Sequence, residues 1–108
     1  MFDGSKLMAV YVDFANISFR QDRWCHLLAD SLDELHDFAL LINVDKRWFH
    51  KNASYPHYDI TVRTREIAIS KGALPSSRKK IIECAKKLKA ELEYNRSLTL
   101  NTNQMSLF

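Results

Sequence analysis

The sequence predicts one small α/β domain with a short three-stranded sheet, about three helices and a flexible C-terminal tail. Apolar runs suited to buried strands, apolar positions at helical spacing, and the loss of any periodicity near the C-terminal end predict this class. The length of 108 residues, with 46% hydrophobic residues, suits a single core. We expect residues 1–94 to form the domain and residues 95–108 to form the tail.

Three segments have the pattern of strands. Residues 8–13, MAVYVD, are an aliphatic and aromatic run that ends in a carboxylate, as expected of a buried strand. Residues 23–29, RWCHLLA, are a second candidate, and residues 57–61, HYDIT, follow Pro56 as a third. We expect these three strands to make up the sheet.

The first predicted helix begins after Ser31. Ser31 and Glu34 have the spacing of a capping box, in which hydroxyl and carboxylate each accept a hydrogen bond from a free amide of the first turn. We expect this helix to end near Asn43. Its apolar face repeats at i, i+3, i+4 and i+7: Leu35, Phe38, Ala39 and Ile42.

Two further helices are predicted in the second half of the chain. Thr61 can cap the first of them, and Gly72 suits the left-handed residue that closes it. Ser76 or Ser77 starts the last helix, and from Asn95 onward the sequence is typical of a flexible linker. The apolar stripe of the last helix consists of Ile81, Ala85, Leu88 and Leu92.

Positive charge is concentrated in residues 61–89, which hold nine basic residues and two acidic ones and are locally +7. Such a block attracts phosphate backbones, although it also fits a solvated helix face. Arg63 and Arg65 could meet a phosphate at a helix start. The candidate phosphate or DNA contacts are Arg63, Arg65, Lys79, Lys80, Lys86 and Lys87.

Several classes of protein are excluded. Gly4 and Gly72 are the only glycines, so a glycine-rich phosphate loop is absent, and there is no GxSxG nucleophile elbow. No apolar run is long enough for a membrane span or a signal peptide, so we expect a cytoplasmic protein without membrane contact. We expect Cys25 and Cys84 to be thiols, because that compartment is reducing.

Carboxylates and imidazoles gather in the first 60 residues, several of them at expected strand ends. We take Asp13, His26, His57 and Asp59 as candidate catalytic residues, with Asp13 and Asp59 as candidate metal ligands. Mixed oxygen and imidazole ligands suit a divalent metal, with magnesium or manganese favoured over zinc. The alternative for Asp13 is that it only caps the turn after the first strand.

Other residues of interest have structural interpretations that weigh more than functional ones. His36 lies near the edge of an apolar helix face, where packing or surface roles are commoner than catalysis. Trp24, Trp48, Phe49 and Tyr58 fit a core better than a platform for stacking bases.

The chain ends in QMSLF, a polar residue followed by a spacer and two apolar anchors. This pentapeptide resembles the motif by which bacterial polymerases and mismatch-repair proteins bind the replicative sliding clamp, and it departs from that motif only at Met105. The resemblance implies that Gln104 hydrogen-bonds at a pocket rim while Leu107 and Phe108 fill an apolar groove, with Met105 and Ser106 between them. The alternative is that the apolar end folds back onto the domain.

The body of the chain also resembles a known family. The stretches AVYVDFANISF, RWCHLLADSLDELHDFA, RWFH and PHYDI resemble the bacterial and phage proteins grouped as domain of unknown function 4031 (DUF4031). The resemblance covers roughly residues 8–73 and implies no activity.

Together these patterns predict a DNA replication or repair protein that docks on the bacterial DNA polymerase III sliding clamp, the beta subunit. Its body would be a metal-dependent phosphodiesterase or nuclease-like hydrolase acting on DNA or a nucleotide. The alternative is a non-enzymatic clamp accessory or inhibitor of phage origin, which competes with polymerases for the same pocket. A third reading is a DNA-binding module that uses the basic segment and whose clamp motif is a coincidence.

Overall fold

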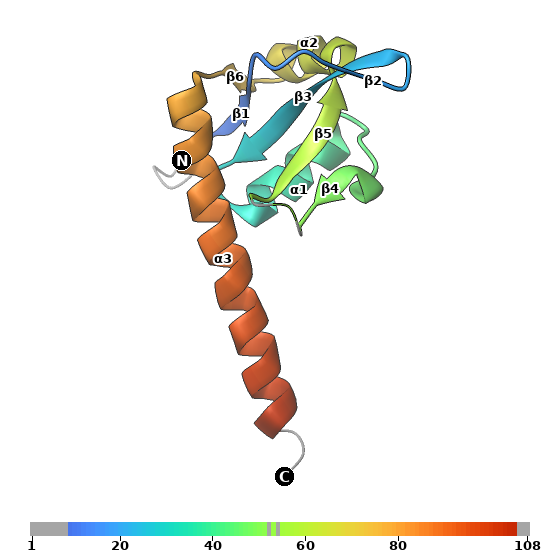
Figure 1. Ribbon diagram of the computed structural model, residues 1–108. Coiled ribbons are helices and arrows are strands. Elements are labelled where there is room, and N and C mark those ends of the chain that lie inside the picture. Colours follow the sequence, from blue (N-terminus) through green and yellow to red (C-terminus); the bar gives the residue numbers. More distant parts are fainter. Residues whose placement is uncertain (1–8, 52, 54, 106–108) are drawn as a thin grey trace, which may run out of the picture.

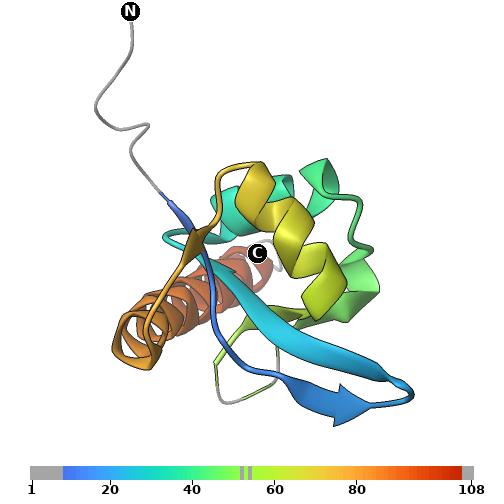
Figure 2. The same cartoon turned by 90° about the horizontal axis from the view of Figure 1, so that it is seen from above.

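Two short helices cover one face of a mixed β-sheet, and a long third helix crosses the opposite face (Figures 1 and 2). The computed structural model describes residues 9–51, 53 and 55–105, with the backbone alone for residues 100–105. Within this part of the chain the structure has three α-helices and a six-stranded sheet, which confirms the predicted α/β class.

Strand β3 is the centre of the sheet, because it pairs with β1, β2 and β5. The order is β4-β5-β3-β1-β6, and every pair is antiparallel except β1 with β6. The strands are β1 (Val10–Val12), β2 (Ile17–Phe19), β3 (Asp22–Ala29), β4 (Phe49–His50), β5 (His57–Thr61) and β6 (Leu74–Pro75).

The prediction of a three-stranded sheet was wrong in the number of strands. The three predicted strands are present as β1, β3 and β5, and the structure adds β2, β4 and β6. The added strands have three, two and two residues, too short to show an alternating pattern. Pro75 is tolerated in β6 because this strand lies at an edge of the sheet.

The helices are α1 (Leu32–Leu41), α2 (Val62–Ser70) and α3 (Arg78–Met105). The predicted N-caps are confirmed, since Ser31 Oγ accepts from the Glu34 amide at 3.1 Å and Thr61 Oγ1 accepts from the Thr64 amide at 3.0 Å. Gly72, with φ of +112°, closes the turn after α2 as expected.

Helix α3 is longer than the sequence predicts. It continues to Met105, so the stretch expected to be a linker after Asn95 is helical here. Residues 78–105 contain no glycine or proline to end the helix, and the Thr99 hydroxyl donates to the Asn95 carbonyl at 3.1 Å. Ser106, Leu107 and Phe108 of the predicted docking peptide lie outside the described residues.

The core lies on both sides of β3. Leu27 and Tyr58 face α1, and Leu88 of α3 packs on the opposite side, each at most 1% exposed. Cys25 and Cys84 are free, buried thiols, as predicted, and burial raises the pKa of each to about 12. None of the helices in the described part of the chain has the length and apolar character needed to cross a membrane.

Candidate metal centre

The strand register brings three of the four candidate catalytic residues onto one face of the sheet. His26 of β3 lies opposite Asp59 of β5, and His57 lies two residues before Asp59. Because side chains alternate along a strand, these three residues share a face, while Tyr58 and Ile60 point to the other. That shared face is the one that α3 partly covers, and we call it the open face.

Asp13, the fourth candidate, follows β1 and holds His26 in place. Asp13 Oδ2 lies 2.6 Å from His26 Nδ1, and Asp13 Oδ1 accepts from the His26 amide at 2.9 Å. Asp13 Oδ1 also accepts from the Ala15 amide at 3.3 Å, so Asp13 caps the turn as well. The side chain of Asp13 is only 15% exposed.

The pKa values of this pair move apart. Burial favours a raised pKa for Asp13, but the hydrogen bonds from the His26 side chain and amide together outweigh it and lower the pKa. The bond to Asp13 raises the pKa of His26, against the opposing effect of burial. An ionised carboxylate only accepts, so His26 Nδ1 carries a hydrogen. In the neutral ring, Nε2 therefore keeps a free lone pair.

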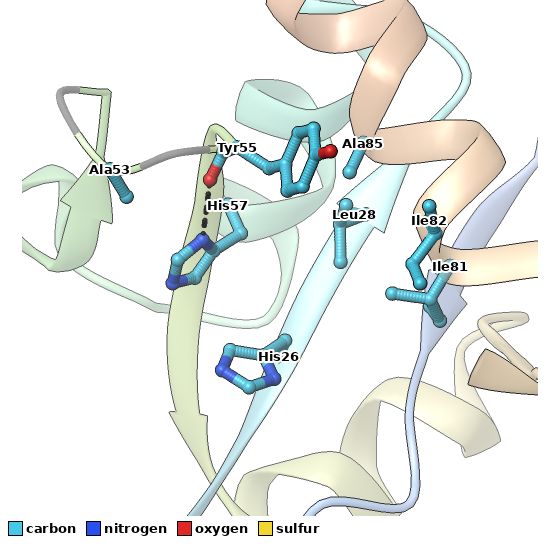
Figure 3. A pocket seen from close by; sticks show the side chains of 8 residues that line it. All are labelled: His26, Leu28, Ala53, Tyr55, His57, Ile81, Ile82 and Ala85. Atoms are coloured by element: carbon cyan, nitrogen blue, oxygen red, sulfur yellow. Dashed lines mark hydrogen bonds between the residues drawn. The ribbon is translucent and has the colours of Figure 1, made fainter. Parts of the chain in front are cut away.

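Asp59 bridges two imidazoles. Its Oδ2 lies 2.8 Å from His50 Nε2, and its Oδ1 lies 3.1 Å from His57 Nε2. His57 Nδ1 lies 2.8 Å from the Tyr55 carbonyl, which can only accept, so Nδ1 carries a hydrogen (Figure 3). A neutral His57 then directs the lone pair of Nε2 at a carboxylate oxygen. Such an arrangement is favourable only when a proton or a cation lies between the two atoms.

The surroundings of His57 disfavour a proton on its Nε2 atom. Burial lowers the pKa of His57, and together with the neighbouring His26 and His50 it outweighs the hydrogen bond to the Tyr55 carbonyl and the charge of Asp59, which both raise the pKa. A divalent cation can take the place of that proton, because it binds a neutral imidazole and an ionised carboxylate together.

His26, His57 and Asp59 also have the distances of a candidate cation site. One ligand atom from each residue lies within 4.8 Å of the others. Zn–N bonds of about 2.0 Å would hold ligand atoms roughly 3.3 Å apart. His57 Nε2 and Asp59 Oδ1 are already 3.1 Å apart, so binding would draw His26 toward them. Asp13, which the sequence predicted as a metal ligand, lies outside this group of three and contacts its member His26.

A hollow of about 330 Å³ opens beside this cluster (Figure 3). His26 and His57 stand on one side of it, and an apolar wall from β3 and α3 stands on the other. That wall consists of Leu28, Ile81, Ile82 and Ala85. A second hollow of about 410 Å³ shares His26, Tyr55, Ile81 and Ile82 with the first and reaches Asp13, Ser76 and Arg78. The centre therefore adjoins both an apolar site and a positively charged residue.

The predicted basic residues do not gather around this centre. Arg63 lies 3.7 Å from Asp22, and Arg65 donates to the Asp13 carbonyl at 3.0 Å, which supports the turn that holds Asp13. Lys80 lies over the Tyr11 ring at 5.1 Å. The exposed lysines of α3 are Lys79, Lys86, Lys87 and Lys89. Since α2 and α3 lie on opposite faces of the sheet, the basic segment does not form one surface (Figure 2).

The aromatic and histidine residues predicted to pack divide between the two faces. Tyr58 is 1% exposed, and its hydroxyl lies 2.8 Å from His36 Nδ1. Phe49 packs against both rings, with centroid distances of 4.7 Å to His36 and 5.2 Å to Tyr58. Trp24 and Trp48 are only half-buried.

Sequence reasoning did not select His50 or the Tyr55 carbonyl. His50 lies in a two-residue strand, directly opposite His57 in the β4–β5 register. The imidazole of His50 is a common metal ligand, and this was the only indication of its role in the sequence. Its position beside Asp59 depends on the β4–β5 register. The Tyr55 carbonyl is a backbone group and gives no signal in the sequence.

Comparison with known families identifies a related family. A family model described as protein of unknown function (DUF4031) matches residues 10–88, a range that contains the whole cluster and the first part of α3. The predicted resemblance of the body is thereby confirmed and extends further along the chain. No curated protein and no solved structure matches the chain.

Proposed function

We propose that this chain, which belongs to the DUF4031 family, is a divalent-metal-dependent phosphodiesterase that docks on the bacterial DNA sliding clamp through its C-terminal peptide. The family match supplies no activity, so the proposal rests on the chain's own residues. The open face supports the catalytic half, and the QMSLF sequence supports the docking half.

The observation that carries the catalytic half is that each candidate ligand has a second partner. His26 Nδ1 is held by Asp13, His57 Nδ1 by the Tyr55 carbonyl, and the second oxygen of Asp59 by His50. Partners of this kind orient metal ligands and fix the tautomer of each imidazole. An unrelated surface cluster has no need for all of them.

Two imidazoles and one carboxylate leave open coordination positions for water and substrate. This ligand set favours zinc or manganese over magnesium, which prefers oxygen ligands. A metal bound here would lower the pKa of a bound water toward 7 and so supply a nucleophile. Arg78 of the adjoining hollow would attract the phosphate, and the apolar wall would exclude bulk water.

Hydrolysis of bis(p-nitrophenyl) phosphate with added manganese, zinc or magnesium tests this half. We expect metal-stimulated turnover that falls at least about 100-fold in Asp59→Asn, because a ligand is lost. His36→Ala, which changes an imidazole on the opposite face, should keep the activity. Turnover that is equal in Asp59→Asn, or absent with every metal, would contradict the proposal.

The docking half is supported by the peptide and by the course of α3. This helix has 28 residues, a length of about 42 Å, and its C-terminal half runs away from the sheet (Figure 1). The C-terminal end of the helix therefore lies away from the candidate centre. Burial of Leu107 and Phe108 in a partner would contribute about 1.5 to 3 kcal/mol each.

Calorimetric titration of the full-length protein into purified sliding clamp tests the docking half, beside a variant that lacks Leu107 and Phe108. We expect a Kd on the order of micromolar that is lost on truncation. Absence of binding, or equal binding by both forms, would overturn it.

The QMSLF sequence also favours a second candidate, a non-enzymatic clamp accessory or inhibitor. Clamp binding without metal-dependent turnover would favour this candidate. It further predicts that the intact protein, and not the truncated one, displaces a labelled polymerase peptide from the clamp.

A further inference from the structure

Aromatic side chains continue along the open face away from α3. Trp24 lies two residues before His26 on the same strand, so the two share a face. The rings of Trp24 and Trp48 lie 5.0 Å apart between centroids, and Ile17 of β2 pairs with Trp24. Phe19 is 55% exposed, and its carbonyl accepts from the indole nitrogen of Trp24 at 2.9 Å. We call Phe19, Trp24 and Trp48 the aromatic platform.

Two arginines accompany this platform. The guanidinium of Arg20 lies 5.2 Å from the Phe19 ring centroid, and that of Arg47 lies 5.7 Å from the Trp48 ring centroid. Among the described residues, neither arginine forms an ion pair with a carboxylate. Each therefore has its charge available to an anion beside an aromatic surface.

The turn that presents Arg20 adds a second observation. Arg20 and Gln21 both have positive φ, at 51° and 64°, between β2 and β3. Glycine and asparagine are the usual residues at such positions, because other side chains are strained there. The backbone is therefore strained in the turn at the tip of the β2–β3 hairpin, which lies away from α3 (Figure 2). This strained turn contains the positively charged Arg20.

We propose that the aromatic platform binds single-stranded nucleic acid, with bases stacked on its rings and phosphates paired with Arg20 and Arg47. Stacking of exposed bases on aromatic rings, with cations along the backbone, is the common mode of binding single strands. This inference deepens the proposed function and rests on it, since it names the substrate class of the centre that contains His26. A strand on the platform would lead directly toward that centre.

The chain offers a direct probe of this contact. Its only two tryptophans are Trp24 and Trp48, so stacked bases would quench most of its indole fluorescence. We would titrate the full-length protein with 20-nucleotide oligothymidylate, with the corresponding oligouridylate and with a 20-base-pair duplex. EDTA in every sample keeps any catalysis out of the measurement.

We expect saturable quenching by the single strands, weaker binding of the duplex, and affinity that falls as salt rises. The double variant Arg20→Ala with Arg47→Ala should bind about tenfold or more weakly. The matched control, Lys86→Ala with Lys87→Ala, removes the same charge from α3 and should change affinity by less than about twofold.

Three results would overturn the inference: no quenching by either single strand, tighter binding of the duplex, or equal loss in both double variants. The last result would show that affinity follows the total positive charge of the protein and not the platform. Because EDTA removes metal, loss of this binding is separable from failure of the hydrolase. Turnover of bis(p-nitrophenyl) phosphate without oligonucleotide binding would refute the platform alone, whereas binding without turnover would refute the metal centre alone.

Discussion

The two faces of β3 and β5 use histidine differently. On the closed face, which α1 and α2 cover, His36 Nδ1 lies 2.8 Å from the neutral Tyr58 hydroxyl and the ring packs at 4.7 Å from Phe49. On the open face, His26 and His57 contact carboxylates and line a hollow. Burial lowers the pKa of both His36 and His57. Burial alone therefore does not distinguish the histidines of the candidate centre from His36. The histidines of the centre differ in having a carboxylate partner and in lining a hollow.

The largest expected effect is on the stability of the closed face. Leu27 is 0% exposed, so Leu27→Ala should lower the free energy of unfolding by about 2 to 5 kcal/mol. On the open face, His57→Ala should lower it by a smaller amount, because this side chain keeps 19% of its surface exposed and borders a hollow. Urea denaturation measures both. A larger loss for His57→Ala would refute the division of roles between the faces.

A second prediction compares the partners of the two kinds of histidine. Asp13→Asn should weaken metal binding about 10- to 100-fold, because the carboxylate orients His26. Tyr58→Phe removes the partner of His36 on the closed face with little change in shape, and it should leave metal affinity unchanged. Competition with a chromogenic chelator measures both. Equal metal affinities for Asp13→Asn and the wild type would show that Asp13 only caps a turn.

The third prediction concerns pH. The pKa of His26 is raised, so its contribution to stability is complete below the ordinary value of about 6.5 and is lost as pH rises through the raised value. The pKa of Asp13 is lowered, so its contribution is lost only when pH falls below about 4 and through the lowered value. Asp13→Asn should therefore cost about 1 to 3 kcal/mol near pH 6 and less near pH 9. Urea denaturation across this range measures the difference, and a cost independent of pH would contradict the ionised pair.

The smallest effect is expected at the cysteines. Cys25 precedes His26 and lies on the closed face, and Cys84 donates to the Ala29 carbonyl at 2.7 Å. Because burial raises the pKa of both thiols to about 12, they should react with Ellman's reagent only in denaturant. Fast labelling of Cys25 in the native protein would show that the closed face opens.

The main elements of the fold were predictable from the sequence, and the short ones were not. The hydroxyl caps at Ser31 and Thr61 and the closing Gly72 each act through neighbours in the chain, so local patterns revealed them. Strands β2, β4 and β6 depend on pairing with distant partners. The extension of α3 to Met105 was missed because its last turns are polar and lack periodicity, which did not prevent a helix without glycine or proline.

The candidate centre was predictable as a set of residues but not as a geometry. Asp13, His26, His57 and Asp59 were selected by type and by their places at strand ends. Which of them contact each other follows from the antiparallel register that pairs His26 with Asp59. The β1–β3 register places Asp13 beside His26, and the β4–β5 register brings His50 to Asp59, which local sequence could not reveal.

Direct metal binding tests the central claim most directly. Manganese and zinc would each be titrated calorimetrically into the metal-free wild type, Asp59→Asn and His36→Ala. We expect saturable binding at one site in the wild type and in His36→Ala, and its loss in Asp59→Asn. Binding that survives in Asp59→Asn, or no binding to the wild type, would contradict a metal centre at His26, His57 and Asp59.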